Sequence, residues 1–343
     1  MNFYKILTIL LLGKHFVLGF VLHQNELKEN SEKLTSSGRG ILAIDESFET
    51  IGKRFETISI DNSYSNRKSY RKLLLTCPNL DKYISGLILS EETFLDNYTN
   101  PLKDIFYGVK VDYGLIPFNN VEKISTGLDS LNKRCKEYYE KGAKFVKWRV
   151  VYSIKNKEYP TKKLIEENSQ TLTEYAFISQ KNGLVPVIEP EILMDGDHSL
   201  EECCQIQKNV LKSLYKKLEE HSVYLPGTLL KTSMTLPGIE YKSKYTSKEI
   251  AEKTIETFKD SVPPSIPGIM FLSGGLSEEK STEYLNAICN FDKKIPWKLS
   301  FSFGRALQNS CLKKWSGKEE NNKIAQQTLL ECIKKNSQAL GNK

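Results

Sequence analysis

The chain has 343 residues, of which 39% are hydrophobic and 27% are charged, and its formal net charge is +7. This is ordinary globular composition, which excludes a low-complexity or disordered protein. Lysines and glutamates are interleaved, as in Lys136-Glu137, whereas nucleic-acid-binding proteins gather their basic residues in runs or stripes. We therefore predict a solvated surface and no nucleic-acid partner, with a positive excess that suits the handling of phosphorylated anions.

We predict that residues 1–36 form an apolar N-terminal extension, a possible targeting segment, and a linker. Phe3–Leu22 is an apolar stretch in which Val17–Gly19 follows a short hydrophobic run, and this resembles a secretory signal with a cleavage site. Lys14-His15 interrupts the stretch, which is too broken for a membrane span. Two interpretations stay open: a targeting signal with Phe20 as the first mature residue, on a secretory or plastid route, or a fortuitous apolar extension. We expect membrane contact only in the first case.

Short runs of β-branched and aliphatic residues alternate with longer segments of helical period, such as 199–221 and 247–261. The alternation repeats eight times, and no GxGxxG or Walker sequence is present. This pattern predicts an α/β fold, a single (β/α)₈ TIM barrel over residues 37–343, rather than a doubly wound sheet. The eight predicted strands are Gly40–Asp45, Gly86–Ser90, Tyr107–Asp112, Lys144–Val150, Val185–Glu191, Thr228–Ser233, Gly268–Ser273 and Trp297–Phe303.

Charged or hydroxyl residues stand at the end of nearly every predicted strand. Because side chains alternate along a strand, Lys147 and Arg149 share one face, as do Glu189 and Glu191. A single charge at such a position indicates a structural ion pair, but charges at most strand ends favour an active site, which barrels carry at their C-terminal face. The seven cysteines are odd in number and lack CxxC spacing, which predicts reduced thiols on helix faces.

Several of these runs match the motifs of a known family. The matching stretches are GRGILAIDES (38–47), GVKVDYG (108–114), KFVKWR (144–149), VPVIEPEIL with DGDH (185–198), GTLLKTSM (227–234), FLSGG (271–275) and FSFGRALQ (301–308). Together they resemble class I fructose-bisphosphate aldolases over roughly residues 37–343. The resemblance implies a metal-independent lyase of glycolysis and gluconeogenesis that reversibly cleaves fructose 1,6-bisphosphate to dihydroxyacetone phosphate and glyceraldehyde 3-phosphate. It further implies a cytoplasmic homotetramer that acts on a phosphorylated sugar and needs no cofactor.

The resemblance assigns a role to each of five strand-end residues. Lys231 forms the Schiff base with the ketose carbonyl. An amine must be neutral to attack, and desolvation and a neighbouring cation, here Lys147, both favour the neutral form. Glu189 is the general acid and base, Asp45 takes the proton of the C4 hydroxyl, and Glu191 is expected to orient the lysines. Only four histidines are present and none lies on a predicted strand end, so no metal site is expected.

Two groups of residues are expected to bind the substrate phosphates. Barrels often bind phosphate in the loops after strands seven and eight. By resemblance, the phosphate next to the ketone is held by Ser273, Gly274, Gly275, Gly304 and Arg305. The candidates for the far phosphate are Ser47, Arg54, Lys110 and Arg149.

Several positions depart from the family pattern. Glu49-Thr50 stands where a Gly-Ser pair is expected and Tyr113 where a lysine is usual. The chain stops at Lys343, where the family usually continues as a mobile tail ending in tyrosine that helps protonate the enamine. The missing tail predicts lowered turnover. A truncated sequence would explain the absence of the tail equally well. Two alternatives therefore stay open: a ketose-phosphate aldolase with shifted substrate preference, or a low-activity scaffold with the aldolase fold.

Overall fold

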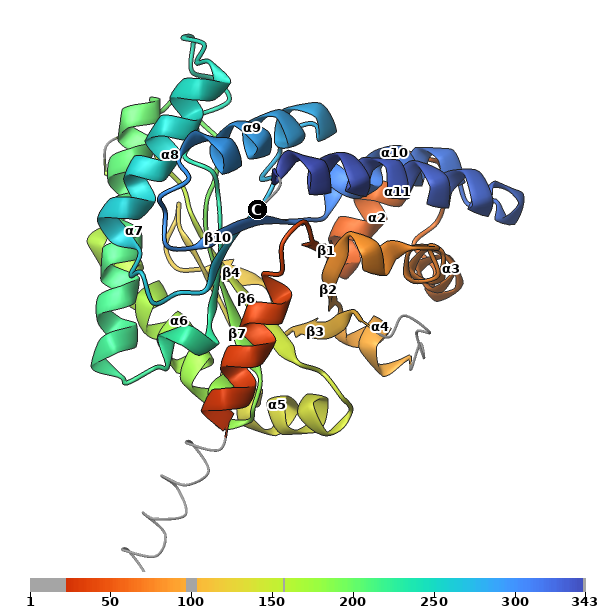
Figure 1. The fold of residues 1–343 in the computed structure, drawn as a ribbon, viewed down its shortest axis with the longest axis horizontal. Coiled ribbons are helices and arrows are strands. Elements are labelled where there is room, and N and C mark those ends of the chain that lie inside the picture. Colours follow the sequence, from red (N-terminus) through yellow and green to blue (C-terminus); the bar gives the residue numbers. More distant parts are fainter. Residues whose placement is uncertain (1–22, 97–103, 157, 342–343) are drawn as a thin grey trace, which may run out of the picture.

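The computed structural model describes residues 23–96, 104–156 and 158–341. Within these residues, eight parallel strands close into a barrel in the order β1-β10-β9-β8-β7-β6-β3-β2 (Figure 1). The eight strands predicted from the sequence are confirmed, to within two residues at each end. They are β1 (Gly40–Ile44), β2 (Ile84–Leu89), β3 (Phe106–Lys110), β6 (Phe145–Tyr152), β7 (Val185–Ile192), β8 (Leu229–Thr232), β9 (Gly268–Phe271) and β10 (Lys298–Phe303).

Helices surround the barrel, and most begin at a serine or threonine whose side chain caps the free N–H groups of the first turn. Ser199 and Thr246 form full capping boxes with a glutamate three residues later, which fixes the starts of α7 and α8. The helices are α2 (Phe48–Glu56), α3 (Tyr64–Leu75), α4 (Glu91–Leu95), α5 (Leu131–Glu140), α6 (Lys162–Lys181), α7 (Leu200–Glu220), α8 (Ser247–Ser261), α9 (Glu278–Phe291), α10 (Arg305–Trp315) and α11 (Asn322–Ala339). A small hairpin of β4 (Leu115–Pro117) and β5 (Lys123–Ser125) follows β3.

The barrel interior is filled by apolar side chains, as expected for parallel strands whose inward residues stack in layers. Phe145 is fully buried there and lies over β3, where Gly108 leaves it room: a Cβ on Gly108 would fall 2.2 Å from the ring. The interior cluster comprises Leu27, Leu34, Ile41, Ala43, Ile88, Phe145, Val185, Val187, Leu229 and Met270.

A helix at residues 23–34 closes the N-terminal end of the barrel. Its Leu27 and Leu34 belong to the interior cluster, and the Ser31 hydroxyl donates to the carbonyl of Pro226 at 2.8 Å. The barrel unit therefore extends N-terminal to the boundary that we placed at residue 37, because this helix covers apolar side chains that would otherwise meet water. The predicted targeting stretch up to Leu22 lies outside the described residues, and in the described part no helix is long and apolar enough to cross a bilayer.

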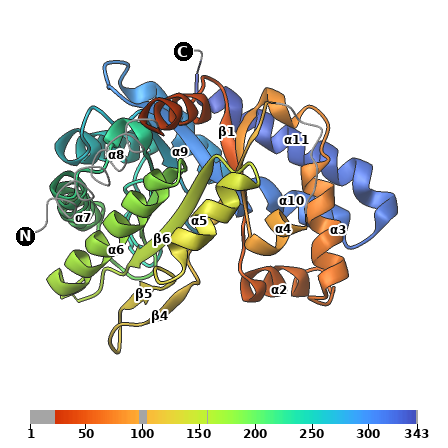
Figure 2. The ribbon, with the colours of Figure 1, turned by 90° about the horizontal axis from the view of Figure 1, so that it is seen from below.

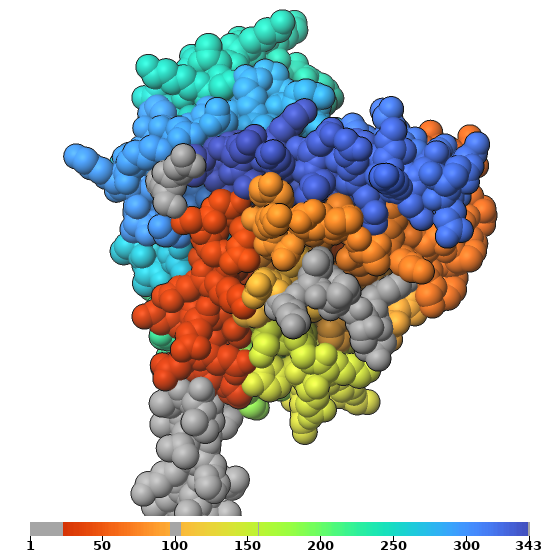
Figure 3. Space-filling view, turned by 45° about the vertical axis from the view of Figure 1, so that its right-hand side comes forward, coloured from red at the N-terminus to blue at the C-terminus, as the bar shows by residue number. Residues whose placement is uncertain are grey.

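The last two helices lie beside the first two helices that follow β1. Figure 2 shows α10 and α11 grouped with α2 and α3 on one side of the barrel, and Figure 3 shows α11 running along the orange residues of α3. The Gln326 side chain of α11 donates to the carbonyl of Leu73 in α3 at 2.8 Å. The same packing brings Gln308 of α10 to Arg54 of α2, 254 positions apart in sequence, beside the end of β1. All seven cysteines lie in the described part of the chain and carry free thiols, six of them on helices, as predicted.

Candidate active site

The strand register brings the predicted catalytic residues to neighbouring levels at one end of the barrel. Val187 pairs with Leu229 and Ile188 with Leu230, so Glu189 and Lys231 are the next neighbours on β7 and β8. Lys147 lies on β6, on the other side of β7. Since the side chains alternate, all three point into the barrel at its C-terminal end.

Glu189 bridges the two lysines. Its Oε1 lies 3.1 Å from Nζ of Lys231 and its Oε2 lies 3.1 Å from Nζ of Lys147, and all three side chains are buried. Burial alone would raise the pKa of the Glu189 carboxyl, but the charges of Lys147 and Lys231 outweigh it and hold the pKa below its usual range. A carboxylate shared between two amines is well placed to move protons at either one.

Asp45 follows β1 and completes this group, which we call the lysine cluster (Asp45, Lys147, Glu189 and Lys231). Its Oδ2 lies 2.7 Å from Nζ of Lys147. Burial would raise the pKa of Asp45, but the ammonium of Lys147 and then that of Lys231 lower it to about 2. For Lys147, burial lowers the pKa, yet Asp45 and Glu189 more than compensate and raise it above its ordinary value. Asp45 is therefore ionised and Lys147 protonated at neutral pH.

Glu191 and Arg149 do not join the lysine cluster. Nε of Arg149 forms an ion pair with Glu191, and burial of the guanidinium is outweighed by that carboxylate, which raises the pKa of Arg149. We expected Glu191 to orient lysines, but its partner is an arginine. The register gives the reason: Lys147 pairs with Val187 and Arg149 with Glu189, and each cation contacts the carboxylate two residues beyond its partner, so Glu189 meets Lys147 and Glu191 meets Arg149.

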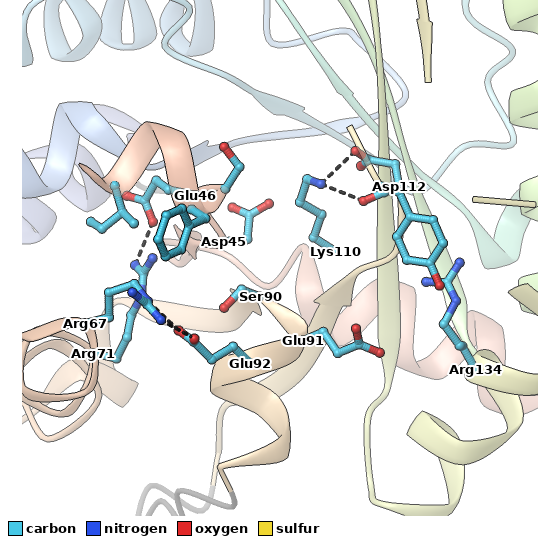
Figure 4. Close-up of a pocket in the computed structure, with 14 residues that line it drawn as sticks. Asp45, Glu46, Arg67, Arg71, Ser90, Glu91, Glu92, Lys110, Asp112 and Arg134 are labelled. Carbon is cyan, nitrogen blue, oxygen red and sulfur yellow. Dashed lines mark hydrogen bonds and ion pairs between the residues drawn. The ribbon is translucent and has the colours of Figure 1, made fainter. Parts of the chain in front are cut away.

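A pocket of about 180 Å³ opens beside Asp45 at the ends of β1, β2 and β3 (Figure 4). On one wall, Lys110 lies 2.8 Å from Oδ1 of Asp112 and 2.7 Å from the Asp112 carbonyl. Ser47, the N-cap of α2, also lines the pocket. The lining residues are Asp45, Glu46, Ser47, Phe48, Ile51, Arg67, Arg71, Ser90, Glu91, Glu92, Lys110, Asp112, Tyr113 and Arg134. Two predicted far-phosphate residues, Ser47 and Lys110, thus face this space.

Arg54 does not line this pocket, contrary to our expectation. It is only 7% exposed and forms an ion pair with Glu46, which Arg71 also contacts at 2.6 Å. We call Glu46, Arg54 and Arg71 the arginine cluster. Burial would raise the pKa of Glu46, but Arg71 and Arg54 lower it. Arg54 lies on the inner face of α2, and that face is covered by α3 and α10 through Tyr70 and Gln308.

The loops after β9 and β10 have the shape expected for anion binding. Gly274 and Gly275 have φ values of +44° and +96°, a left-handed conformation that glycine adopts without strain. A Cβ on Gly275 would meet no atom within 4 Å, so its backbone is accessible. Arg305 is the first residue of α10 and is exposed, whereas Ser273 is mostly buried. The structure therefore brings the five predicted near-phosphate residues to two adjacent strand ends.

Sequence reasoning did not assign a role to Glu46, Arg71, Asp112 or Gln308. Glu46 is the residue after Asp45, and its partners on α2 and α3 are invisible without the fold. Gln308 could have been found by helical period, because it lies one turn after Arg305. Among the described residues, no group of three or more His, Cys, Asp or Glu side chains is placed to hold a metal ion.

Comparisons with known proteins agree with this geometry. A family model described as fructose-bisphosphate aldolase class-I matches residues 26–343. The chain is 45% identical to cytosolic fructose-bisphosphate aldolase 4 of Arabidopsis thaliana, covering 98% of this chain and 88% of that protein. It is 46% identical to the cytoplasmic isozyme of Spinacia oleracea, over 92% of this chain and 91% of that one.

A solved structure of fructose-bisphosphate aldolase from Plasmodium falciparum, in complex with TRAP and a small-molecule inhibitor, superposes with a TM-score of 0.89. The two sequences are 45% identical, and the match covers 93% of this chain and 94% of the Plasmodium chain. The range matched by the family model, residues 26–343, includes the strand ends that carry the lysine cluster. The chain therefore belongs to the class I fructose-bisphosphate aldolase family.

Proposed function

We propose that Lys231 is the amine that attacks the ketone of fructose 1,6-bisphosphate in this class I, metal-independent lyase. The observation that carries the assignment is the contact between Lys231 and Glu189, both buried at the mouth of the barrel. Lys231 first gives a proton to a neighbouring base, and its lone pair then adds to C2. The product is a carbinolamine, which must lose its hydroxyl as water to become a protonated imine.

Glu189 is the group that moves these protons. It contacts Lys231 through one oxygen and Lys147 through the other, so it can accept a proton from the first amine without leaving its place. Returned to the carbinolamine hydroxyl, that proton leaves with the oxygen as water. Lys147 stays protonated throughout, because its carboxylate neighbours raise its pKa. Its positive charge stabilises the negative charge that develops on oxygen.

Asp45 performs the cleavage step. Its carboxylate is ionised and takes the proton of the C4 hydroxyl, and the C3–C4 bond then breaks to give the aldehyde of glyceraldehyde 3-phosphate. The electron pair of that bond moves into the protonated imine and leaves an enamine on Lys231. Protonation of the enamine carbon and hydrolysis of the imine release dihydroxyacetone phosphate and restore the lysine.

The two phosphates bind on either side of the lysine cluster. Gly274 and Gly275 offer backbone N–H groups and Arg305 offers a guanidinium for the phosphate next to the ketone. Lys110 and Ser47 face the pocket that receives the far phosphate. Arg149 keeps its assignment to this phosphate, and it must then share its guanidinium between Glu191 and the substrate.

Covalent trapping tests the assignment of the nucleophile. We expect that incubation with dihydroxyacetone phosphate and borohydride, followed by peptide mass spectrometry, gives one adduct, on Lys231. Lys147 is an internal control, since it is equally buried in the same cluster but paired with two carboxylates. An adduct on Lys147, or none in folded protein, contradicts the proposal. Activity should be unchanged by metal chelators.

We also propose a cytosolic homotetramer. The support is the family itself and the two plant relatives, which are named as cytosolic and cytoplasmic isozymes. Sedimentation equilibrium should give a mass four times that of the chain, and a monomer mass would refute the assembly. A full-length fusion to a fluorescent protein should be distributed through the cytosol, and accumulation in an organelle would refute the location.

A further inference from the structure

We propose that Gln308 is a positioning residue that holds the near-phosphate arginine at a fixed distance from the far-phosphate side of the site. This inference rests on the proposed function, since it uses the two phosphate positions assigned there. The Gln308 side chain contacts none of the residues that we assign to either phosphate. It joins the segments that carry these residues on the two sides of the site.

The Gln308 side chain contacts three segments that lie far from it in the sequence. Its Nε2 donates to the carbonyl of Ala43 at 2.6 Å, two residues before Asp45. Its Oε1 accepts from Nη1 of Arg54 at 3.1 Å and from the hydroxyl of Tyr70 at 3.0 Å. The side chain has no exposed surface. The amide orientation follows from its partners, because a carbonyl can only accept and a guanidinium can only donate.

The segments joined by Gln308 carry both phosphate sites. Arg305 and Gln308 both lie in the first turn of α10. This turn therefore carries both the near-phosphate arginine and the buried amide. Arg54 lies on α2, the helix whose N-cap is Ser47 on the wall of the far-phosphate pocket. The start of α10 also packs directly on β1: a Cβ built on Gly304 would lie 3.4 Å from the Ala43 carbonyl oxygen.

The arginine cluster makes this connection stiff. Arg54 is held by Glu46, and Glu46 is held by Arg71 of α3, so the guanidinium that contacts Gln308 cannot turn away without breaking a buried ion pair. Buried charges without a partner are costly, so this set has one favourable arrangement. Consequently α2, α3, the end of β1 and the first turn of α10 hold one another in register. A substrate with a phosphate at each end needs that fixed spacing, whereas a substrate with one phosphate does not.

Substrate discrimination tests the role. In a Gln308→Leu variant we expect kcat/KM for fructose 1,6-bisphosphate to fall about tenfold to a hundredfold, since misplacement of a positioning group by about 1 Å costs up to that much. The value for fructose 1-phosphate should fall less, because only the bisphosphate depends on the spacing between the two phosphate positions, and the Lys231 adduct with dihydroxyacetone phosphate should still form. Gln308→Glu keeps the acceptor for Arg54 and Tyr70 but loses the donor to Ala43, so it should show an intermediate loss of discrimination.

Gln180 provides the matched control. It is equally buried and donates to the carbonyls of Tyr224 and Gly227, but at the N-terminal end of the barrel, away from the site. Gln180→Leu should lower stability without changing the ratio of the two kcat/KM values. If the ratio is unchanged in both Gln308 variants while stability falls as in Gln180→Leu, Gln308 is only structural and the inference is wrong. If the unmodified enzyme cleaves neither sugar phosphate, the proposed function itself fails, whatever the variants do.

Discussion

The lysine cluster and the arginine cluster are both buried, and each includes one of two neighbouring residues at the end of β1. They differ in whether their cations can lose a proton. Asp45 contacts Lys147 of β6, while Glu46 contacts Arg54 of α2 and Arg71 of α3. A lysine amine can lose its proton in a protein, whereas a guanidinium stays protonated at all physiological pH values. The two groups have similar burial, but only the lysine cluster offers an amine that can lose its proton and act as a nucleophile.

The surroundings of the two clusters differ in the same sense. Asp45 lines the open pocket, as do Glu46 and Arg71, but Glu189 is shared by two lysines and can change partners when a substrate arrives. Arg54 is enclosed between α2, α3 and α10, with Glu46, Tyr70 and Gln308 as fixed partners. Removing a charge should therefore cost mainly activity in the lysine cluster and mainly stability in the arginine cluster.

Replacement of the nucleophile should give the largest effect on activity. We expect Lys231→Met to lower kcat/KM by about 10⁴-fold or more, because the covalent pathway is lost. The free energy of unfolding should change little, since Glu189 keeps Lys147 as its partner and a buried ammonium is no longer desolvated. Steady-state kinetics and urea unfolding of the same sample measure both. Cleavage at the unmodified rate would end the assignment of Lys231.

Asp45→Asn should separate cleavage from imine formation. The variant lacks the base for the C4 hydroxyl, so we expect kcat for fructose 1,6-bisphosphate to fall about 10²- to 10⁴-fold, the range for general base catalysis. Borohydride trapping with dihydroxyacetone phosphate should still label Lys231, because that step uses Glu189. Equal loss of trapping and cleavage would mean that Asp45 acts by maintaining Lys147 rather than as a base.

Glu46→Gln should produce the opposite pattern. It leaves Arg54 and Arg71 buried with no carboxylate between them, and breaking a buried pair in this way costs about 3–5 kcal/mol of unfolding free energy. Trapping at Lys231 in the folded fraction should persist. Glu92→Gln is the control, because its pair with Arg67 is 41% exposed on the glutamate side and should contribute about 1 kcal/mol or less. Similar unfolding midpoints for both variants would contradict the comparison.

Much of the fold and of the lysine cluster could be predicted from the sequence. Each strand is a short aliphatic run, and a polar residue marks the point where it leaves the apolar barrel, so Lys147, Glu189 and Lys231 are recognisable one strand at a time. The alternation of side chains along β6 and β7 then gives the face on which they lie. No long-range information is needed, because parallel strands in a barrel bring all these ends to one side.

The contacts that the sequence did not reveal are those between helices and strand ends. Nothing in the spacing of Arg54 shows that its face of α2 is covered by α10, which lies about 250 residues later. We placed residues 23–34 in the N-terminal extension and linker, and only the open end of the barrel explains the burial of Leu27 and Leu34. Such pairings depend on tertiary packing, which has no local pattern.

The pH dependence of stability should show the smallest and most graded difference between the clusters. Asp45, Glu46 and Glu189 all have pKa values below their ordinary range in the folded protein, and that of Asp45 falls from 3.8 to about 2. A carboxyl with a lowered folded pKa contributes stability above its unfolded pKa and loses it as the pH falls through the folded value. The contribution of these carboxyls to the unfolding free energy should therefore be constant above about pH 5 and fall between about pH 4 and 2.

Urea unfolding at each pH should show a shallower fall for Asp45→Asn and for Glu46→Gln, since each variant removes one group that takes up a proton more readily in the unfolded chain. A slope unchanged in Glu46→Gln but reduced in Asp45→Asn would mean that the Glu46 carboxyl binds its proton equally well in the folded and the unfolded chain, which would contradict its lowered pKa.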